Sequence, residues 1–116
     1  MQHRDKICLQ KIIKEISIGQ ELMADARLEE FLENELLKRA ISMTVINVGE
    51  LIKVVTDELR QQHPEIPWKA AAGMRDITAH RYQTLRMEDV YNTAVTEFPQ
   101  IKIQLEQILA QNDCAD

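Results

Sequence analysis

The chain has 116 residues, of which 45% are hydrophobic and 28% charged, and its formal net charge is −5. This length leaves room for one domain with one core, and the composition is that of a folded protein rather than a disordered one. Three glycines and three prolines are too few for an all-β fold, the negative charge disfavours a general nucleic-acid coat protein, and no apolar run approaches the roughly 18 residues that cross a bilayer.

The N-terminus and the two cysteines predict a cytoplasmic protein. The first five residues, Met1 to Asp5, carry charges, and no apolar signal segment follows them. Cys8 and Cys114 lie near opposite ends of the chain without CxxC spacing. We interpret them as free thiols in a reducing compartment, and a disulfide that joins the two ends is the alternative interpretation.

Helical periodicity predicts two helices in the first half of the chain. The first runs from about Arg4 to Ala24, where apolar residues recur at spacings of three and four: Leu9, Ile12, Ile13, Ile16 and Met23. After a polar junction, a near-heptad pattern predicts an uninterrupted helix from about Glu29 to Gln62. At 1.5 Å per residue this helix would be about 50 Å long, which exceeds the need of a compact bundle. We therefore expect a homodimer, in which the extra length packs against a second copy.

Two prolines mark the clearest break in the chain. Pro64 and Pro67 cannot both lie inside a helix, and Pro67 is well placed as a first helical residue. A third helix is therefore predicted from about Trp68 to Tyr82, followed by a loop from Gln83 to Arg86.

The last helical region starts near Met87, and Pro99 should kink or split it. The tail from Gln111 is expected to fray. Helices joined by short loops pack as bundles. The sequence thus predicts an all-α fold, an up-and-down bundle of four to five helices, in a single domain over residues 1–116 that is ordered from about 4 to 110.

Four side chains suited to chemistry lie within eight positions of the third predicted helix, namely Arg75, Asp76, His80 and Tyr82. Arg75 and Tyr82 are seven apart and share a face, and the Asp76 carboxylate can reach the His80 imidazole four residues later. Arg75 and His80, five apart, point about 140° away from each other on an ideal helix. They can meet at one atom if the helix ends or distorts there, or if a cleft between two helices or two protomers receives both.

An arginine and a histidine together suit a phosphodiester. A guanidinium binds phosphate oxygens through paired hydrogen bonds, and an imidazole can move a proton near neutral pH. Arg75 and His80 could therefore cleave RNA without a metal, with Asp76 fixing the tautomer of the histidine. Taken alone, this spacing occurs often by chance, and a structural network of salt bridges is the commoner explanation.

Several motifs together carry a family resemblance. Arg75-x-x-x-x-His80-x-Tyr82 resembles the signature of HepT toxins within the HEPN superfamily. The resemblance extends to Gly49-Glu50 on the long predicted helix, to Pro67-Trp68-Lys69 and to Gly73-Met74-Arg75. It covers roughly residues 4 to 110.

The resemblance implies a helical homodimer with its active cleft at the interface. It implies a metal-independent endoribonuclease toxin, with Arg75 and His80 as catalytic residues and RNA as the substrate. It also implies a partner, a minimal nucleotidyltransferase antitoxin that transfers AMP to the motif tyrosine, here Tyr82. An added AMP group would block RNA by its bulk and its negative charge.

The chain departs from many members of this family at two positions. They have Asn after the motif arginine and Asp between the histidine and the tyrosine, where this chain has Asp76 and Arg81. Asp76 is still a polar residue that could orient His80. Arg81 reverses a charge beside the site, which leaves the details of substrate and antitoxin recognition open.

Two other functions compete with the ribonuclease hypothesis. The chain could be a non-catalytic helical dimer that binds a nucleotide or docks a partner, with Arg75 holding a phosphate and His80 structural. It could also be no more than the substrate and partner of a nucleotidyltransferase. His3 and His63 have no partners at ligand spacing, so we expect neither a metal site nor a cofactor.

Three further residues have alternative interpretations. Gly49 indicates either close approach by another helix or simple tolerance of a glycine. Glu50 either pairs with Arg75 across helices or forms a surface salt bridge. Trp68 is interpreted as a core anchor, with a platform for base stacking as the alternative.

Overall fold

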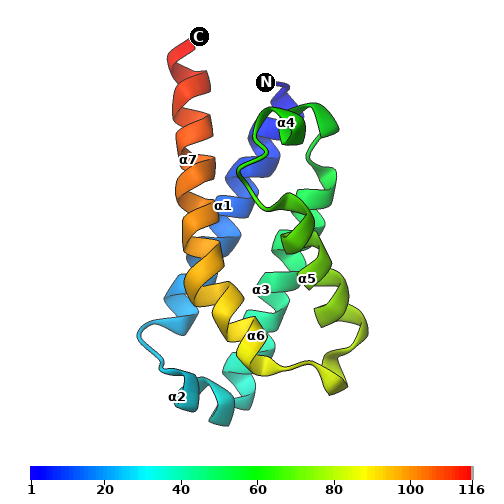
Figure 1. Cartoon of the computed structure of the whole chain (residues 1–116). Coiled ribbons are helices and arrows are strands. Elements are labelled where there is room, and N and C mark those ends of the chain that lie inside the picture. Colours follow the sequence, from blue (N-terminus) through cyan, green and yellow to red (C-terminus); the bar gives the residue numbers. More distant parts are fainter. Residues whose placement is uncertain (116) are drawn as a thin grey trace.

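The computed structural model describes residues 1–115, with side chains described as far as Asn112, and every element in that range is helical. The α-helices, drawn in Figure 1, are α1 (His3–Met23), α2 (Leu28–Glu33), α3 (Glu35–Val54), α4 (Asp57–Gln62), α5 (Trp68–His80), α6 (Met87–Asn92) and α7 (Phe98–Ala115). A 3₁₀ turn covers Tyr82–Thr84 and a π-helical turn covers Thr93–Glu97. The predicted all-α fold is confirmed.

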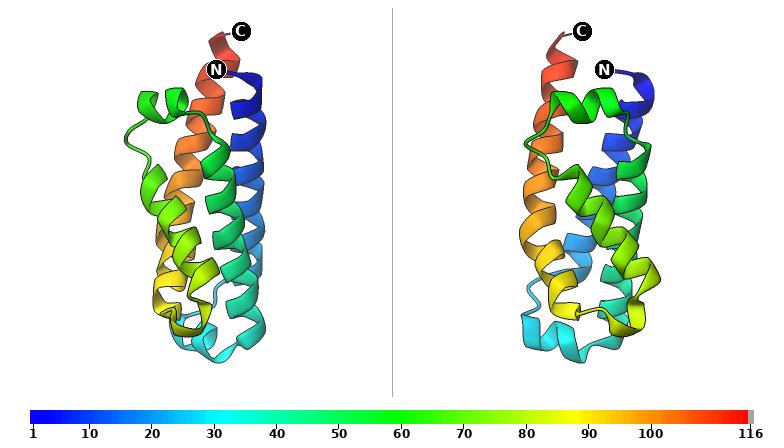
Figure 2. Two further views of the ribbon diagram at one scale, coloured as in Figure 1. Left: turned by 90° about the vertical axis from the view of Figure 1, so that its right-hand side faces the viewer. Right: turned by 45° about the vertical axis from the view of Figure 1, so that its right-hand side comes forward.

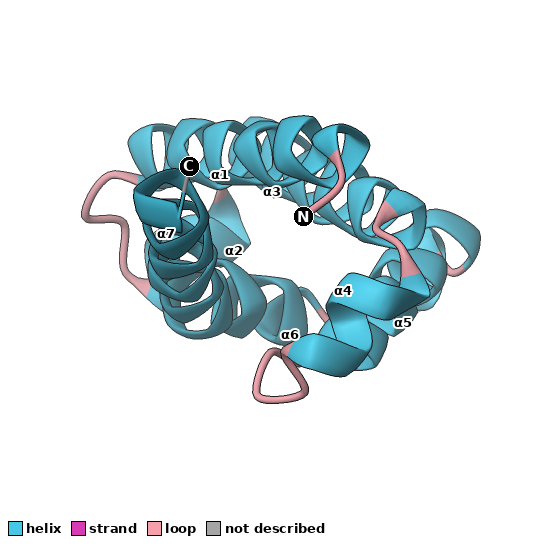
Figure 3. Ribbon diagram, turned by 90° about the horizontal axis from the view of Figure 1, so that it is seen from above, coloured by secondary structure: helices cyan, strands magenta, loops and turns pink. Residues whose placement is uncertain are grey.

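The long helices form an elongated bundle of 47 × 27 × 20 Å. Helix α3 packs against α1 on one side and α5 on the other, and α7 packs against α1 (Figure 2). Viewed along the bundle, these helices surround one centre (Figure 3), which apolar side chains fill. The deepest of them are Leu9, Ile12, Ile16, Phe31, Ile41, Val45, Val48, Ile52, Val90 and Leu105.

The predicted helix over 29–62 is wrong, because the chain breaks it at two points. At the first break, the Asn34 side chain accepts a hydrogen bond from the backbone N–H of Leu37 (3.0 Å) and caps α3. At the second, Thr56 caps α4 and is itself held by the buried carboxylate of Asp5 in α1, which accepts from the Thr56 backbone N–H (3.0 Å) and hydroxyl (2.5 Å). Helix α3 is therefore 20 residues long. We expected a dimer because the predicted helix was too long for a compact bundle. Helix α3 is shorter than that, so helix length no longer supports a dimer.

The predicted break near Pro99 is confirmed. A proline has no N–H to donate to the carbonyl four residues earlier, and its ring crowds that carbonyl. The helix widens into the π-helical turn just before Phe98 and Pro99, and α7 then continues to Ala115. The third helix ends at His80, two residues earlier than predicted.

Cys8 is a free, buried thiol that donates a hydrogen bond to the Leu51 carbonyl (3.0 Å). Burial raises the pKa of this thiol, which disfavours the reactive thiolate. The Cys114 side chain lies outside the described side chains. None of the described helices has the length and apolar character that crossing a bilayer requires.

Candidate active site

Helix α5 carries the motif, and its first residue is fixed in the core. The Trp68 side chain is buried, and its indole N–H donates to the His63 carbonyl (2.9 Å) across the proline-containing loop. This confirms Trp68 as a core anchor. The anchor sets where α5 begins and therefore which residues face α3.

Gly49 allows α5 to approach α3 closely. A Cβ added at Gly49 would lie 2.1 Å from the Cβ of Arg75 and 2.8 Å from its Cγ, far inside van der Waals contact. Of the two interpretations of this glycine, the close approach of another helix is confirmed. The contact places the Cβ and Cγ of Arg75 directly against α3.

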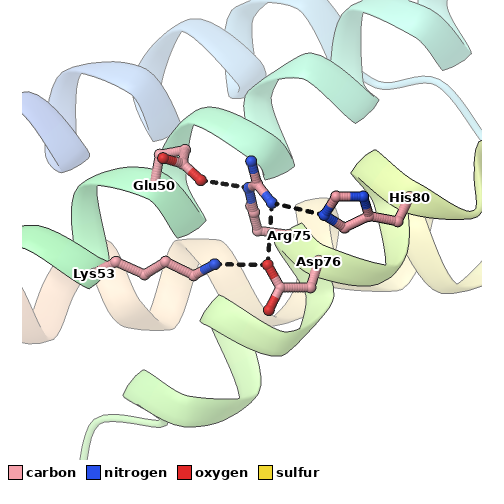
Figure 4. Close-up of polar contacts among 5 residues, drawn as sticks. All are labelled: Glu50, Lys53, Arg75, Asp76 and His80. Carbon is pink, nitrogen blue, oxygen red and sulfur yellow. Dashed lines mark hydrogen bonds and ion pairs between the residues drawn. The ribbon is translucent and has the colours of Figure 1, made fainter.

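Five polar side chains from α3 and α5 meet at this contact (Figure 4), and we call them the site cluster: Glu50, Lys53, Arg75, Asp76 and His80. Glu50 forms an ion pair with Nε of Arg75. Nη1 of Arg75 lies 3.1 Å from Oδ1 of Asp76 and 3.4 Å from Nε2 of His80. Lys53 contributes its Nζ at 2.6 Å from the same Asp76 oxygen.

Arg75 and His80 meet at the C-terminal end of α5. His80 is the last residue of α5, and Arg81 leaves the helix with φ −129° and ψ 31°. A guanidinium can only donate, so Nε2 of His80 is the acceptor in this contact. The pair thus presents a basic imidazole nitrogen beside a fixed positive charge, with His80 exposed and the Arg75 side chain 21% exposed.

Asp76 does not hold His80, contrary to the sequence-based expectation. Its carboxylate is taken by Lys53 and Arg75, and no contact in the described part of the chain joins it to the imidazole. The hydrogen bond from Lys53, and then that from Arg75, lower the pKa of Asp76. Sequence reasoning missed Lys53, although its position three residues after Glu50 places both on one face of α3.

Tyr82 lies apart from the site cluster. Because α5 ends at His80, the tyrosine is on the following 3₁₀ turn and not on the helical face of Arg75. Its ring lies under the guanidinium of Arg39, 5.6 Å from the ring centroid, and borders a cavity of about 200 Å³ that Ser42, Met43 and Ile46 also line. Its hydroxyl is buried and makes no hydrogen bond to the described residues.

The remaining candidates have structural roles. Tyr91 donates its hydroxyl proton to the Ala26 carbonyl (2.9 Å) and packs against Phe31. His63 lies 3.3 Å from Glu65. Among the described residues, no group of three His, Cys, Asp or Glu side chains could hold a metal ion.

Comparisons with known proteins relate this chain to a family of ribonucleases. Residues 12–108 match the family model described as "Ribonuclease HepT-like". A protein of Caldanaerobacter subterraneus named "Putative RNase" is 31% identical over 101 residues, which are 87% of this chain and 90% of that protein. A protein of Methanocaldococcus jannaschii with the same name is 36% identical over 85 residues, 73% of each chain.

A third relative extends the match over nearly the whole chain. The "Probable ribonuclease HepT" of Thermococcus cleftensis is 27% identical over 108 residues, 93% of this chain and 98% of that protein. No solved structure matches significantly.

Proposed function

Because this chain belongs to the HepT-like ribonuclease family, we propose that it is a toxin of a toxin–antitoxin pair, an endoribonuclease that cuts RNA without a metal ion. The observation that carries the proposal is the contact between Nη1 of Arg75 and Nε2 of His80. It joins a permanent cation to a proton acceptor at an exposed end of α5.

In the proposed reaction, His80 is the base and Arg75 stabilises charge. When the Arg75 guanidinium turns to the phosphate, it releases Nε2 of His80. This nitrogen then takes the proton of a ribose 2′-hydroxyl, and the 2′-oxygen attacks the adjacent phosphorus. The bond to the 5′-oxygen breaks, that oxygen takes a proton from water, and a 2′,3′-cyclic phosphate remains; the proton held by His80 is returned to solvent. The guanidinium of Arg75 neutralises the charge that grows on the phosphoryl oxygens.

RNA cleavage in excess EDTA tests this proposal. Purified protein should cut a single-stranded RNA, and it should leave the same strand intact when every ribose carries a 2′-O-methyl group, because the attacking oxygen is blocked. Binding of RNA or nucleotide without any cleavage would instead support the non-catalytic alternative.

We also propose that the second wall of the active site comes from a second copy of the chain. Leu36, Met43 and Val54 lie along one line of α3, because steps of 7 and 11 residues return to within about 20° of the same direction. All three are exposed, Leu36 to 82%. Glu50 of the site cluster is seven residues after Met43 and lies on the same line, so a copy docked there would border the site.

Sedimentation equilibrium tests the dimer. Met43→Lys should shift the protein toward the monomer, because a charge at the centre of an apolar interface is costly to bury. Ile103→Lys, at an apolar residue of α7 that is just as exposed, is the matched control and should leave the assembly unchanged. A wild-type protein that is monomeric at all concentrations would contradict the proposed homodimer.

We propose that a nucleotidyltransferase antitoxin silences the toxin by adding AMP to Tyr82. The phenol oxygen would attack the α-phosphorus of ATP, with pyrophosphate leaving and the phenol proton released to solvent. Because the hydroxyl is buried, the ring must first turn out of its cavity. Once modified, an anionic group would not return to that cavity, and it would stay outside, two residues from His80.

Intact mass after incubation with such a nucleotidyltransferase and ATP tests this step. We expect an increase of one or more AMP groups, and Tyr82→Phe should abolish it while Tyr91 remains present. Modification that persists in Tyr82→Phe would show that another residue is the acceptor.

A further inference from the structure

Two cations from different helices bind one carboxylate oxygen in the site cluster. Oδ1 of Asp76 lies 2.6 Å from Nζ of Lys53 on α3 and 3.1 Å from Nη1 of Arg75 on α5. Nη1 of Arg75 is also the atom that contacts the imidazole. Oδ1 therefore occupies a position near His80 where two positive charges converge.

We infer that Lys53 is a second phosphate-binding residue and that the Asp76 carboxylate holds the place of the substrate phosphate in the free protein. This inference rests on the proposed ribonuclease function, since RNA supplies the phosphate. An anionic phosphate oxygen at the position of Oδ1 would accept hydrogen bonds from both cations and lie beside the proposed base. Lys53 lies outside the Arg-His-Tyr motif, so its role follows from the packing of α3 against α5.

The charge balance of the site cluster supports an exchange of Asp76 for phosphate. With a neutral imidazole, the carboxylates of Glu50 and Asp76 balance the charges of Lys53 and Arg75, so the cluster as a whole does not attract an anion. Lys53 and Arg75 can bind a phosphate when the Asp76 carboxylate turns away from them. The Asp76 side chain is 50% exposed, which leaves it free to rotate into solvent.

Stability does not explain the Lys53–Asp76 pair. Exposed ion pairs contribute little to folding, and the Lys53 side chain is 41% exposed. The contact between α3 and α5 is already made at Gly49, where backbone and side chain meet directly. A role for Lys53 in binding the substrate phosphate explains why a lysine lies opposite Asp76.

Binding of a 2′-O-methyl RNA, which cannot be cut, tests the inference in the full-length protein. Each lost phosphate contact to a single strand should lower the slope of log K against log salt by about 0.7, which corresponds to about fivefold weaker binding at 0.1 M salt than for the wild type. We expect this change for Lys53→Met, with circular dichroism confirming the fold. Lys38→Met is the matched control, because Lys38 lies on α3 and pairs with Glu35 (3.2 Å), about 22 Å along the helix from Lys53.

A second variant separates a direct contact from an effect through Asp76. Asp76→Asn removes the competing negative charge and should tighten RNA binding. If Lys53 binds the phosphate, Lys53→Met will weaken binding in the Asp76→Asn background as well. If Lys53 serves only to hold Asp76, its replacement will have no effect in that background, and the inference is overturned.

The two proposals fail in different ways. A wild-type protein that cuts RNA, with the same salt slope in Lys53→Met, would overturn the role of Lys53 and leave the ribonuclease intact. A wild-type protein that binds the uncut RNA and never cleaves an unmodified strand would overturn the ribonuclease, while the salt slope would still decide the role of Lys53. A wild-type protein that does not bind RNA would overturn both.

Discussion

His80→Ala is expected to lower the rate of RNA cleavage by about 10²- to 10⁴-fold, the usual contribution of a positioned general base or acid. The variant loses the nitrogen that faces Arg75 and keeps everything else in the site cluster. Single-turnover cleavage of a labelled RNA in EDTA measures the effect. Binding of the 2′-O-methyl RNA should change far less, because Lys53 and Arg75 remain.

The fold should tolerate this substitution. His80 is exposed and is the last residue of α5, so its removal leaves no cavity and breaks no buried hydrogen bond. His3→Ala is the matched control, since His3 is also exposed and also lies at a helix end, as the first residue of α1. If His80→Ala cleaves as fast as His3→Ala, the imidazole has no part in the chemistry.

Gly49→Ala is expected to impair both stability and cleavage. The new methyl group would lie 2.1 Å from the Cβ of Arg75, so α5 must move away from α3. Overpacking of this kind typically costs about 1–3 kcal/mol of folding free energy. A shift of about 1 Å in a catalytic group can lower the rate by about 10²-fold, so cleavage by the folded fraction should fall as well.

Gly73→Ala is the control for the effect of adding a methyl group to a helix. A Cβ at Gly73 would meet nothing within 4 Å, and this glycine lies on α5, two residues before Arg75. Alanine there should stabilise the helix by up to about 1 kcal/mol and leave cleavage unchanged. Urea denaturation measures the free energy of unfolding of both variants. If Gly49→Ala and Gly73→Ala are equally stable, α3 and α5 can move apart at Gly49 without a loss of folding free energy.

Local patterns were enough to predict which parts of the chain are helical. The apolar spacing of the first segment predicted a helix within one residue of each end of α1, and the two prolines of the 63–67 segment predicted the break before α5. Such signals depend on residues a few positions apart. The breaks on either side of α3 escaped the same reasoning because the apolar pattern runs through them. Thr56 is held by Asp5, 51 residues away in the chain, which no local pattern can show.

The motif residues were likewise chosen from sequence, whereas their partners depend on packing. Arg75, His80 and Tyr82 follow from one segment and from the family signature that this segment resembles. Spacing could not decide that α5 ends at His80, that Lys53 competes successfully for Asp76, or that the Tyr82 hydroxyl turns inward.

The sequence by itself determined an all-helical chain with a candidate Arg–His pair, because periodicity and residue chemistry are properties of neighbouring positions. The tertiary structure alone decided which side chains share a site. A glycine on α3 sets how near α5 lies, and that distance determines whether a lysine, a carboxylate and a guanidinium from two helices can meet.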